Sequence, residues 1–437
     1  MTDRRSVLLI TSNGTGMGHL VRQLAIAASM PSDIRCTILT LSKAASTAAR
    51  AGAPIEYCPS YATPWITKRA WHRGYLRDRI VALAEEVDAD VIAFDGVVPY
   101  PGLLAAMRQL AAASVWVRRG VWRADASTAP LAYADLFDLI IEPADLGGSM
   151  DAGATKGRGD ARQVGVITRA RAEGMLERAA AARVLGVDPE RPTVLFNVGS
   201  SSVPGLDAVM RRIAAREDLQ VVSTRDALER VSADGDGGRV RTVAGLFPLH
   251  PYLATVDLAV TSVGYNAAHE FTACAVPTVL VPAESVTDDQ RARALAMQQR
   301  GLGIVAESAT SIGSVVESLI DDELARAAMA LAAREVSSTW TDGAAEAAAL
   351  LVGLTPRGKF DMFPLARLRM RLAAETVLAL RDRRPTLPGA VLTHDLRAVD
   401  LGGAEAVEHV LPGTSQDYLD RRGVIARRWL GVAPRTL

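Results

Sequence analysis

The segment 261–290 contains residue types and spacings that are typical of an anion-binding site. Residues 256–260 are nearly all apolar, as in a strand buried on both faces, and Gly264 and Asn266 then open a short helix. A helix that begins beyond the carboxyl end of a strand offers free N–H groups to phosphates in open α/β sheets. The spacing alone therefore predicts an anion site on an α/β sheet.

Three polar residues follow this helix start at positions that suit a nucleotide or a sugar. Glu270 lies one turn inside the helix, within reach of a ribose diol. Asp289 and Gln290 follow the next predicted strand, where a carboxylate and an amide can contact sugar hydroxyls.

A second candidate site follows the first predicted strand, residues 6–11. The glycine-rich turn 13–18, with Gly16 and Gly18, leads into a helix, which is the arrangement of phosphate-binding loops, although the spacing is not G-x-G-x-x-G. His19 follows this turn and could act as a general base on an acceptor hydroxyl or donate to a phosphate. The alternative is a histidine that only caps the turn.

Asp95 is the candidate partner of this histidine. It ends the strand predicted near residues 89–94, on the same edge as His19 if the sheet is parallel. A carboxylate there could orient the imidazole of a general base. A turn or helix-capping aspartate before Pro99 is the alternative.

Basic residues suggest where an acceptor could bind. Arg118 and Arg119 follow the strand at 114–117 and could hold an acceptor phosphate, or could be solvated strand-end arginines. The segment 63–79 mixes Trp65 and Trp71 with basic residues, as membrane-surface and lipid-phosphate contacts do. That segment could instead be an acceptor wall, or an amphipathic helix with core aromatics and solvated charges.

Composition limits the class of protein. A chain of 437 residues suits two domains and a tail, and 49% hydrophobic residues provide a large core. The formal net charge of +0 argues against general nucleic-acid binding. The three cysteines have no metal-site spacing, which favours buried free thiols in a reducing compartment. We expect neither a signal peptide nor a membrane span, and hence a cytoplasmic protein.

The α/β pattern occurs twice. We expect an N-terminal Rossmann-like domain at 1–160, a C-terminal Rossmann-like domain at 161–354, and an extension at 355–437. In the second domain, Gly199 and Ser200 form another small-residue loop after a strand. A ligand role repeats the strand-then-loop design, and an ordinary loop is the alternative.

Together, Gly264, the helix start at Asn266, Glu270 with the small-residue run to Pro277, and Asp289-Gln290 resemble the donor-nucleotide segment of GT-B glycosyltransferases. The likeness is greatest to the bacterial family that includes the GlcNAc transferase making lipid II, and looser to macrolide and plant UDP-sugar transferases. The resemblance implies an α/β fold of two Rossmann-like domains that face each other across a cleft, with a C-terminal helical extension. The domain at 1–160 would bind the acceptor and the domain at 161–354 the nucleotide-sugar donor, and the extension at 355–437 would contain a crossover helix.

The resemblance also implies roles for individual residues. Glu270 would hold the ribose, the amides around Asn266 and Ala267 the diphosphate, and Asp289 and Gln290 the donor sugar. Leu246 or Phe247 would face the base. The first glycine loop, with Gly16 and Gly18, would lie at the floor of the cleft, near the acceptor and the donor phosphate. Other residues expected near the donor phosphates are Arg169, Gly199 and Ser200, and Arg169 could also be a plain surface arginine.

The function implied is an inverting, metal-independent transfer of a hexose, with UDP-GlcNAc or another UDP-hexose as donor, to an acceptor hydroxyl. The nucleotide-sugar is then a substrate, and no cofactor is expected. The acceptor stays open between a lipid-linked saccharide, a polysaccharide and a small natural product, with peripheral membrane contact through 63–79 as an option. The rivals are a nucleotide-sugar 2-epimerase on the same fold and a non-catalytic nucleotide-sugar-binding partner. An NAD-dependent oxidoreductase is more distant, because no acidic residue ends the second strand.

Overall fold

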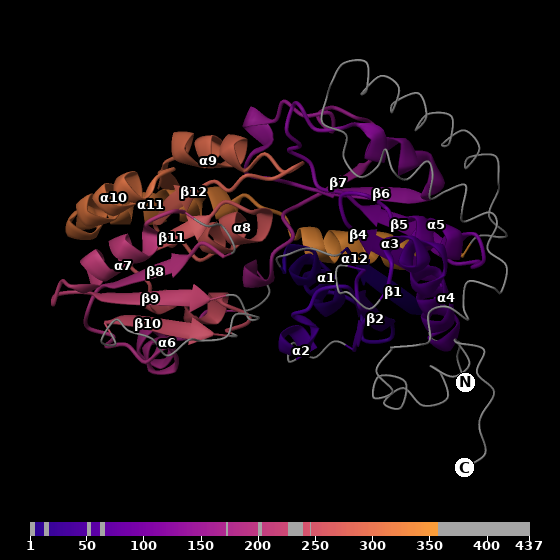
Figure 1. Ribbon diagram of the computed structural model, residues 1–437, viewed down its shortest axis with the longest axis horizontal. Helices are drawn as coiled ribbons and strands as arrows, with labels where there is room; N and C mark the ends of the chain where they lie inside the picture. Colours follow the sequence, from indigo (N-terminus) through magenta and orange to yellow (C-terminus); the bar gives the residue numbers. More distant parts are fainter. Residues whose placement is uncertain are drawn as a thin grey trace, which may run out of the picture.

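The computed structural model describes residues 5–12, 17–49, 54–61, 66–171, 174–199, 203–225, 239–244 and 246–356. Gly16, Trp65 and Ser200 lie outside these residues, as does nearly all of the predicted extension at 355–437. Two parallel sheets organise the described chain, in the strand orders β3-β2-β1-β4-β5-β6-β7 and β10-β9-β8-β11-β12-β13 (Figure 1). Each contains the 3-2-1-4-5-6 order of doubly wound folds, as the two predicted Rossmann-like domains require.

The first sheet forms because its strands are short apolar runs that are buried on both faces. Every residue of its three central strands, β1, β4 and β5, is buried. The strands are β1 Ser6–Thr11, β2 Arg35–Thr40, β3 Ile55–Tyr57, β4 Val91–Asp95, β5 Ala113–Val117, β6 Leu139–Pro143 and β7 Arg162–Val164. The last of these lies just past residue 160, where the first domain was expected to end.

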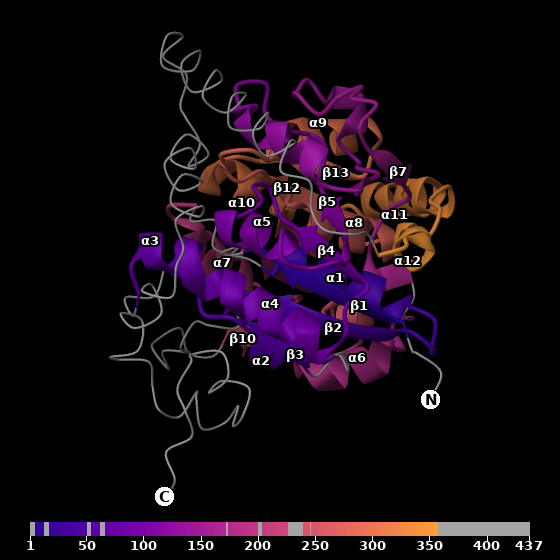
Figure 2. The ribbon, with the colours of Figure 1, turned by 90° about the vertical axis from the view of Figure 1, so that its right-hand side faces the viewer.

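Helices cover both faces of this first sheet. One face packs against α4 and α5, which Figure 2 shows on the near side, and the other against α1. The helical elements of this part are α1 Gly18–Ala28, α2 Ala45–Ala48, α3 Lys68–Ala70, η2 Trp71–Tyr75, α4 Leu76–Glu86, α5 Pro101–Met107, η3 Ala129–Leu136 and η4 Gly148–Met150.

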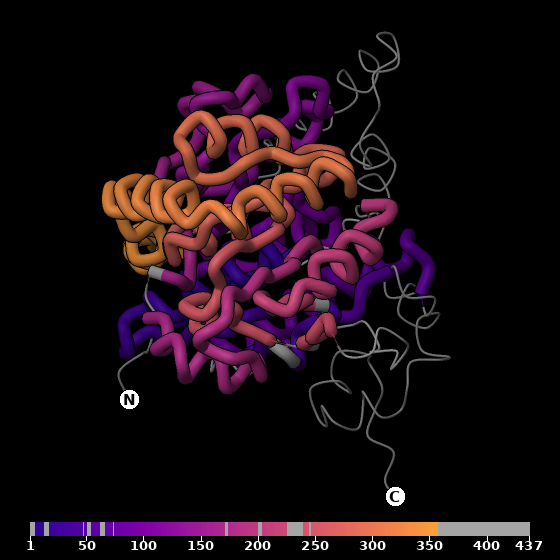
Figure 3. Tube along the Cα trace, turned by 90° about the vertical axis from the view of Figure 1, so that its left-hand side faces the viewer, coloured from indigo at the N-terminus to yellow at the C-terminus, as the bar shows by residue number. Residues whose placement is uncertain are grey.

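The second sheet is built in the same way. Its strands are β8 Thr193–Asn197, β9 Gln220–Arg225, β10 Val240–Ala244, β11 Leu258–Ser262, β12 Thr278–Val281 and β13 Gly303–Val305. Its helical elements are η5 Arg169–Arg171, α6 Arg178–Leu185, α7 Leu206–Ala214, η6 His250–Thr255, α8 Tyr265–Ala273, α9 Gln290–Gln299, α10 Ala309–Asp321 and α11 Glu323–Ser338. Figure 3 faces this unit, with the orange helices α9 to α11 toward the viewer.

The chain crosses back to the first unit at α12, Gly343–Gly353. Its apolar face, including Ala347 and Leu351, joins the core cluster of Val7 and Leu24 beneath the first sheet. The crossing is close at its start, because a Cβ on Gly343 would stand 1.9 Å from the carbonyl oxygen of Gly165. The crossover helix predicted within 355–437 lies almost wholly outside the described residues, and the described crossing occurs before it, at α12.

A short arm, residues 119–123, also joins the two units. Trp122 forms an antiparallel bridge with Asp288, in the loop after β12. Two backbone bonds flank it, from Asp289 N to Val121 O at 3.0 Å and from Arg123 N to Thr287 O at 2.7 Å. Val121 has a φ of 52°, the left-handed region that a β-branched residue rarely occupies, so the surrounding packing must hold the arm in this shape.

Candidate functional site

His19 and Asp95 meet at the switch point of the first sheet. His19 lies in the first turn of α1, which follows β1, and Asp95 ends β4, the neighbour of β1 where the strand order reverses. His19 Nδ1 lies 2.6 Å from Asp95 Oδ1. The expectation that a parallel sheet brings these residues to one edge is confirmed. Ligands bind at such switch points in open α/β sheets.

The surroundings keep Asp95 ionised and His19 neutral. Burial alone would raise the pKa of Asp95, but the neighbouring Arg22 and His19 hold it below its usual value. Burial lowers the pKa of His19, and the charges of Arg22 and Arg119 add to this, while Asp95 opposes it. An ionised Asp95 can only accept, so it favours the tautomer with the proton on Nδ1 and leaves Nε2 as an acceptor.

The N-terminus of α8 faces this pair from the second sheet. Gly264 caps α8, which follows β11 at the switch point of that sheet. Asn266 Nδ2 donates to Gly18 O at 2.7 Å, so the two switch points touch directly. Asn266 Oδ1 is buried and has no hydrogen-bond partner among the described residues. Ala267 lies in the same first turn, where backbone N–H groups can bind an anion.

Glu270 is bonded to the segment that follows the expected base-binding residues Leu246 and Phe247. Glu270 Oε1 accepts from His250 N at 2.9 Å, and its side chain stays 20% exposed. Phe247 lies near Arg169, whose guanidinium carbon is 5.9 Å from the ring centroid. Phe247 and Leu246 are half-buried, whereas Arg169 is buried. The structure thus groups Glu270 with the segment that was expected to read the base.

Asp289 and Gln290 are held as the start of α9. Asp289 Oδ1 accepts from Ala292 N at 2.9 Å as the helix cap, and Gln290 Oε1 accepts from Ala283 N at 3.0 Å. Gln290 Nε2 points toward Gly264, since a Cβ placed there would stand 4.0 Å from it. These bonds orient both side chains before any sugar binds.

Gly199 follows β8 with a φ of 59°, a left-handed conformation that glycine adopts readily. It lies in the loop after β8, a strand that pairs directly with β11. This adjacency keeps the loop on the same sheet edge as the start of α8.

The residues expected at the acceptor are mostly engaged in the protein interior. Arg118 has no exposed side-chain surface and pairs with Glu142 and Asp160. Trp71 is also fully buried and donates to Pro59 O at 2.8 Å, which favours the core interpretation of its segment. Arg119 is 16% exposed and pairs with Asp288 at 3.1 Å, on the arm that reaches the second unit.

Sequence reasoning missed several buried charged residues around the site. Arg22 binds Asp95, and its position three residues after His19, on the same helix face, was the available signal. Arg293 of α9 pairs with Asp145 of the first unit and with Asp288, five residues before it in the chain. Asp288 was a local signal, but the pairing with Asp145 could not be read from any local pattern, because that residue lies 148 positions away.

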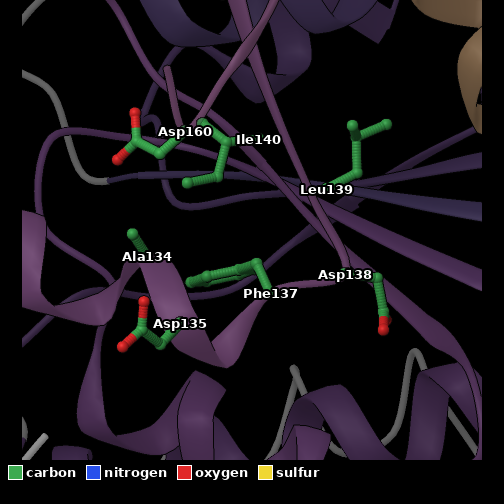
Figure 4. A pocket seen from close by; sticks show the side chains of 7 residues that line it. All are labelled: Ala134, Asp135, Phe137, Asp138, Leu139, Ile140 and Asp160. Atoms are coloured by element: carbon green, nitrogen blue, oxygen red, sulfur yellow. The ribbon is translucent and has the colours of Figure 1, made fainter. Parts of the chain in front are cut away.

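One cavity, of about 270 Å³, lies in the first unit apart from this site. Figure 4 shows its lining side chains, with Phe137 and the carboxylates of Asp135, Asp138 and Asp160 around it. Within the described ranges, no group of three or more His, Cys, Asp or Glu residues could hold a metal ion. Across the same ranges, no helix combines the length and hydropathy needed to cross a bilayer.

Comparison with protein families and curated sequences finds similarity to glycosyltransferases. Residues 193–348 match the model of the Glycosyltransferase family 28 C-terminal domain. The chain is similar in sequence to proteins named UDP-N-acetylglucosamine--N-acetylmuramyl-(pentapeptide) pyrophosphoryl-undecaprenol N-acetylglucosamine transferase. The Clavibacter michiganensis protein is 30% identical over 189 residues, 40% of this chain and 48% of that protein. The Listeria welshimeri protein is 27% identical over 191 residues, which are 40% of this chain and 51% of that protein. The chain spans about half the length of these relatives.

Solved structures match about four fifths of the chain. The glycosyltransferase SnogD from Streptomyces nogalater superposes with a TM-score of 0.55 at 18% identity, over 81% of this chain and 100% of that one. Acinetobacter baumannii MurG superposes with a TM-score of 0.52 at 14% identity, over 80% of this chain and 100% of that one. The spinosyn forosaminyltransferase SpnP superposes with a TM-score of 0.56 at 16% identity, over 80% of this chain and 98% of that one. The chain therefore has the GT-B fold, and most of its second unit matches the family 28 C-terminal domain model.

Proposed function

We propose that this chain is an inverting glycosyltransferase that moves a hexose from a UDP-sugar to an acceptor hydroxyl. The observation that carries the proposal is the contact between the two switch points. The His19–Asp95 pair of the first unit lies beside the first turn of α8, within the family 28 domain, and Asn266 bonds to Gly18 between them. These contacts support a single site that combines a candidate base with a helix start able to bind a phosphate.

The proposed chemistry uses His19 as the general base. Asp95 accepts the Nδ1 proton, and Nε2 removes the proton of the acceptor hydroxyl as its oxygen attacks the anomeric carbon. The bond from that carbon to the diphosphate breaks with inversion, through an oxocarbenium-like transition state. The negative charge that develops on the leaving diphosphate lies at the N-terminus of α8, whose N–H groups stabilise it.

The donor roles follow from position around α8. In this proposal Glu270 binds the ribose, Leu246 and Phe247 the base, and Asp289 and Gln290 the sugar hydroxyls. Gly18, Ala267, Gly199 and Arg169 line the phosphates, together with Gly16 and Ser200, which lie outside the described residues. UDP is favoured as the carrier because the names of the curated relatives state UDP-N-acetylglucosamine as their donor.

The nucleotide-sugar is a substrate in this reaction, and no cofactor or metal takes part. Turnover is therefore expected to persist in excess EDTA. A cytoplasmic location is supported by the free thiols Cys58 and Cys274, which are buried as expected, and by the half-buried Cys36. The acceptor class stays a choice between a lipid-linked saccharide, a polysaccharide and a small natural product.

Thermal stabilisation by nucleotides tests the donor assignment. A ligand at 100 times its Kd stabilises the folded state by about 2.7 kcal/mol. For a domain of about 150–250 residues this corresponds to an increase in Tm of roughly 5–11 °C. We expect this increase with UDP and a UDP-sugar, and none with NAD. Stabilisation by NAD alone, or by no nucleotide, would refute the proposal.

Two variants refine this experiment. Glu270→Ala should weaken UDP binding by about 1–3 kcal/mol, because an ionised acceptor for the ribose is lost. His19→Ala should abolish turnover and leave UDP affinity nearly unchanged. Loss of UDP binding in His19→Ala would instead make His19 a phosphate contact.

A further inference from the structure

Arg22 is a buried arginine that binds the proposed base pair from within α1. Only 1% of its side chain is exposed. Its Nε donates to Asp95 Oδ2 at 2.9 Å, and its Nη2 donates to Asp95 Oδ1 at 2.5 Å. The same Nη2 lies 2.9 Å from His19 Nδ1. A two-point contact of this kind fixes the plane of a carboxylate, which a single charge does not.

The other side of Arg22 packs on the second unit. Its guanidinium carbon lies 5.2 Å from the ring centroid of Tyr265, the first residue of α8. Tyr265 is 2% exposed, and its hydroxyl donates to Ala144 O and accepts from Ile167 N, both at 3.1 Å. Arg22 therefore touches the proposed base pair and the helix that would hold the donor phosphates.

We propose that Arg22 is a positioning residue that orients Asp95 and His19 and, through Tyr265, couples their geometry to the docking of the donor domain. This inference rests on the proposed function, because it concerns the same base. With so little exposed surface, Arg22 does not face a ligand, and its effect on a reaction passes through His19 and Asp95. The base would then be correctly oriented only when α8 is docked against α1.

The electrostatic surroundings of His19 make this proposal measurable. The charged groups near it are Asp95 at the end of β4, Arg22 on α1 and Arg119 in the segment after β5. Of these, the two arginines lower the pKa of His19, and Asp95 raises it. Removing Arg22 should therefore raise the pKa of His19, since Asp95 remains beside it.

The experiment is an NMR titration of the histidine Cε1–H resonances in the full chain. The sequence has six histidines, so His19→Gln identifies the signal of His19. We expect the His19 midpoint to rise in Arg22→Met. In Arg22→Lys it should stay closer to the wild-type value, because the charge remains while the two-point contact is lost. The control Arg216→Met removes a partly exposed arginine that pairs with Asp218 and Asp321, and should leave the midpoint unchanged.

Two variants of Tyr265 test the coupling to the donor domain. Tyr265→Leu removes the aromatic face under Arg22, so the guanidinium should move away from His19 and the His19 midpoint should rise, by less than in Arg22→Met. Tyr265→Phe keeps that face and is the matched control, with a midpoint near that of the wild type. A wild-type midpoint in Tyr265→Leu would overturn the coupling, and a wild-type midpoint in Arg22→Met would overturn the positioning role.

The readouts separate this inference from the proposed function. The titration needs no substrate, so a chain that binds no nucleotide would refute the glycosyltransferase and still report on Arg22. In an active enzyme, Arg22→Met should lower kcat and shift the pH profile while KM for the nucleotide-sugar changes little. A rise in KM for the nucleotide-sugar with unchanged kcat would instead make Arg22 a donor contact. If Arg22→Met does not fold, Arg22→Gln gives the same comparison with a smaller change in polarity.

Discussion

Replacing Arg293 by methionine is expected to destabilise the protein strongly, because Arg293 neutralises two buried carboxylates at the junction of the two units. The Arg293 side chain has no exposed surface. Its Nε and Nη2 donate to Asp145 at 2.8 and 2.7 Å, and Nη2 also donates to Asp288 at 2.8 Å. Its Nη1 donates to Val263 O at 2.8 Å. Methionine would fill the space of the arginine stem without replacing these bonds.

The magnitude follows from which charges lose their partner. Asp145 and Asp288 are each 4% exposed. Asp288 keeps its pair with Arg119, so the main cost falls on Asp145. Removing one partner of a buried ion pair typically costs about 3–5 kcal/mol. This is a large share of a typical free energy of unfolding of about 5–15 kcal/mol.

The loss should depend on pH in a definite direction. In the wild type, burial alone would raise the pKa of Asp145, but Arg293 holds it below its usual value. Such a carboxylate stabilises the folded state above the unfolded pKa of about 3.9, and this stability is lost as pH falls through the folded pKa. Without Arg293, burial dominates and the folded pKa of Asp145 rises above the unfolded value. The variant therefore loses stability as pH rises, and its deficit should be larger at pH 8 than at pH 5.

Urea denaturation at both pH values measures this deficit. The matched control is Arg212→Met, which breaks an exposed pair with Glu317 and should cost about 0–1 kcal/mol at either pH. A loss below about 1 kcal/mol for Arg293→Met at pH 8 would refute the reasoning, since it falls within the range of an exposed pair. A deficit that does not change between the two pH values would refute the assignment to Asp145.

Three further outcomes are expected. Asp95→Asn should lower turnover by about 10²–10⁴-fold with little change in nucleotide affinity, because it removes the charge that orients the proposed base. A parallel loss of turnover and nucleotide affinity would contradict this role. Gly343→Ala should cost about 1–3 kcal/mol in urea denaturation, because its Cβ would meet Gly165 O at 1.9 Å, whereas Gly353→Ala, with open space around it, should not. The Cys58 thiol, whose pKa burial raises to about 12, should react with a thiol reagent at pH 8 only on unfolding, and fast reaction of the native protein would count against this burial.

The sequence was sufficient to predict the sheet topology near the site and its best-defined pair. Buried apolar strands that alternate with helices indicated two doubly wound units. Parallel strands then required His19 and Asp95 to lie at one edge, and the structure places their side chains in contact. Both predictions depend on short-range patterns and on a general rule of sheet geometry.

The remaining parts depend on contacts between distant segments. Arg22 and Arg293 are polar residues within helical patterns, and partners 73 and 148 residues away in the chain, Asp95 and Asp145, help to explain their burial. Arg118 was expected to bind a phosphate or lie in solvent, yet Glu142 and Asp160 neutralise it in the interior. Local residue types cannot distinguish these outcomes, because burial of a charge depends on its partner.

The arm at 119–123 has a consequence for building hybrid enzymes from this fold. If the first domain binds the acceptor, as proposed, exchanging first domains between related proteins would be a route to new acceptor preferences. Here the segment that carries Asp289 is bonded to the backbone of Val121, and Asp288 is paired with Arg119. A hybrid that keeps only this second unit would leave the loop before α9 without its support. The natural unit of exchange is therefore the second domain together with the arm, and not the second domain alone.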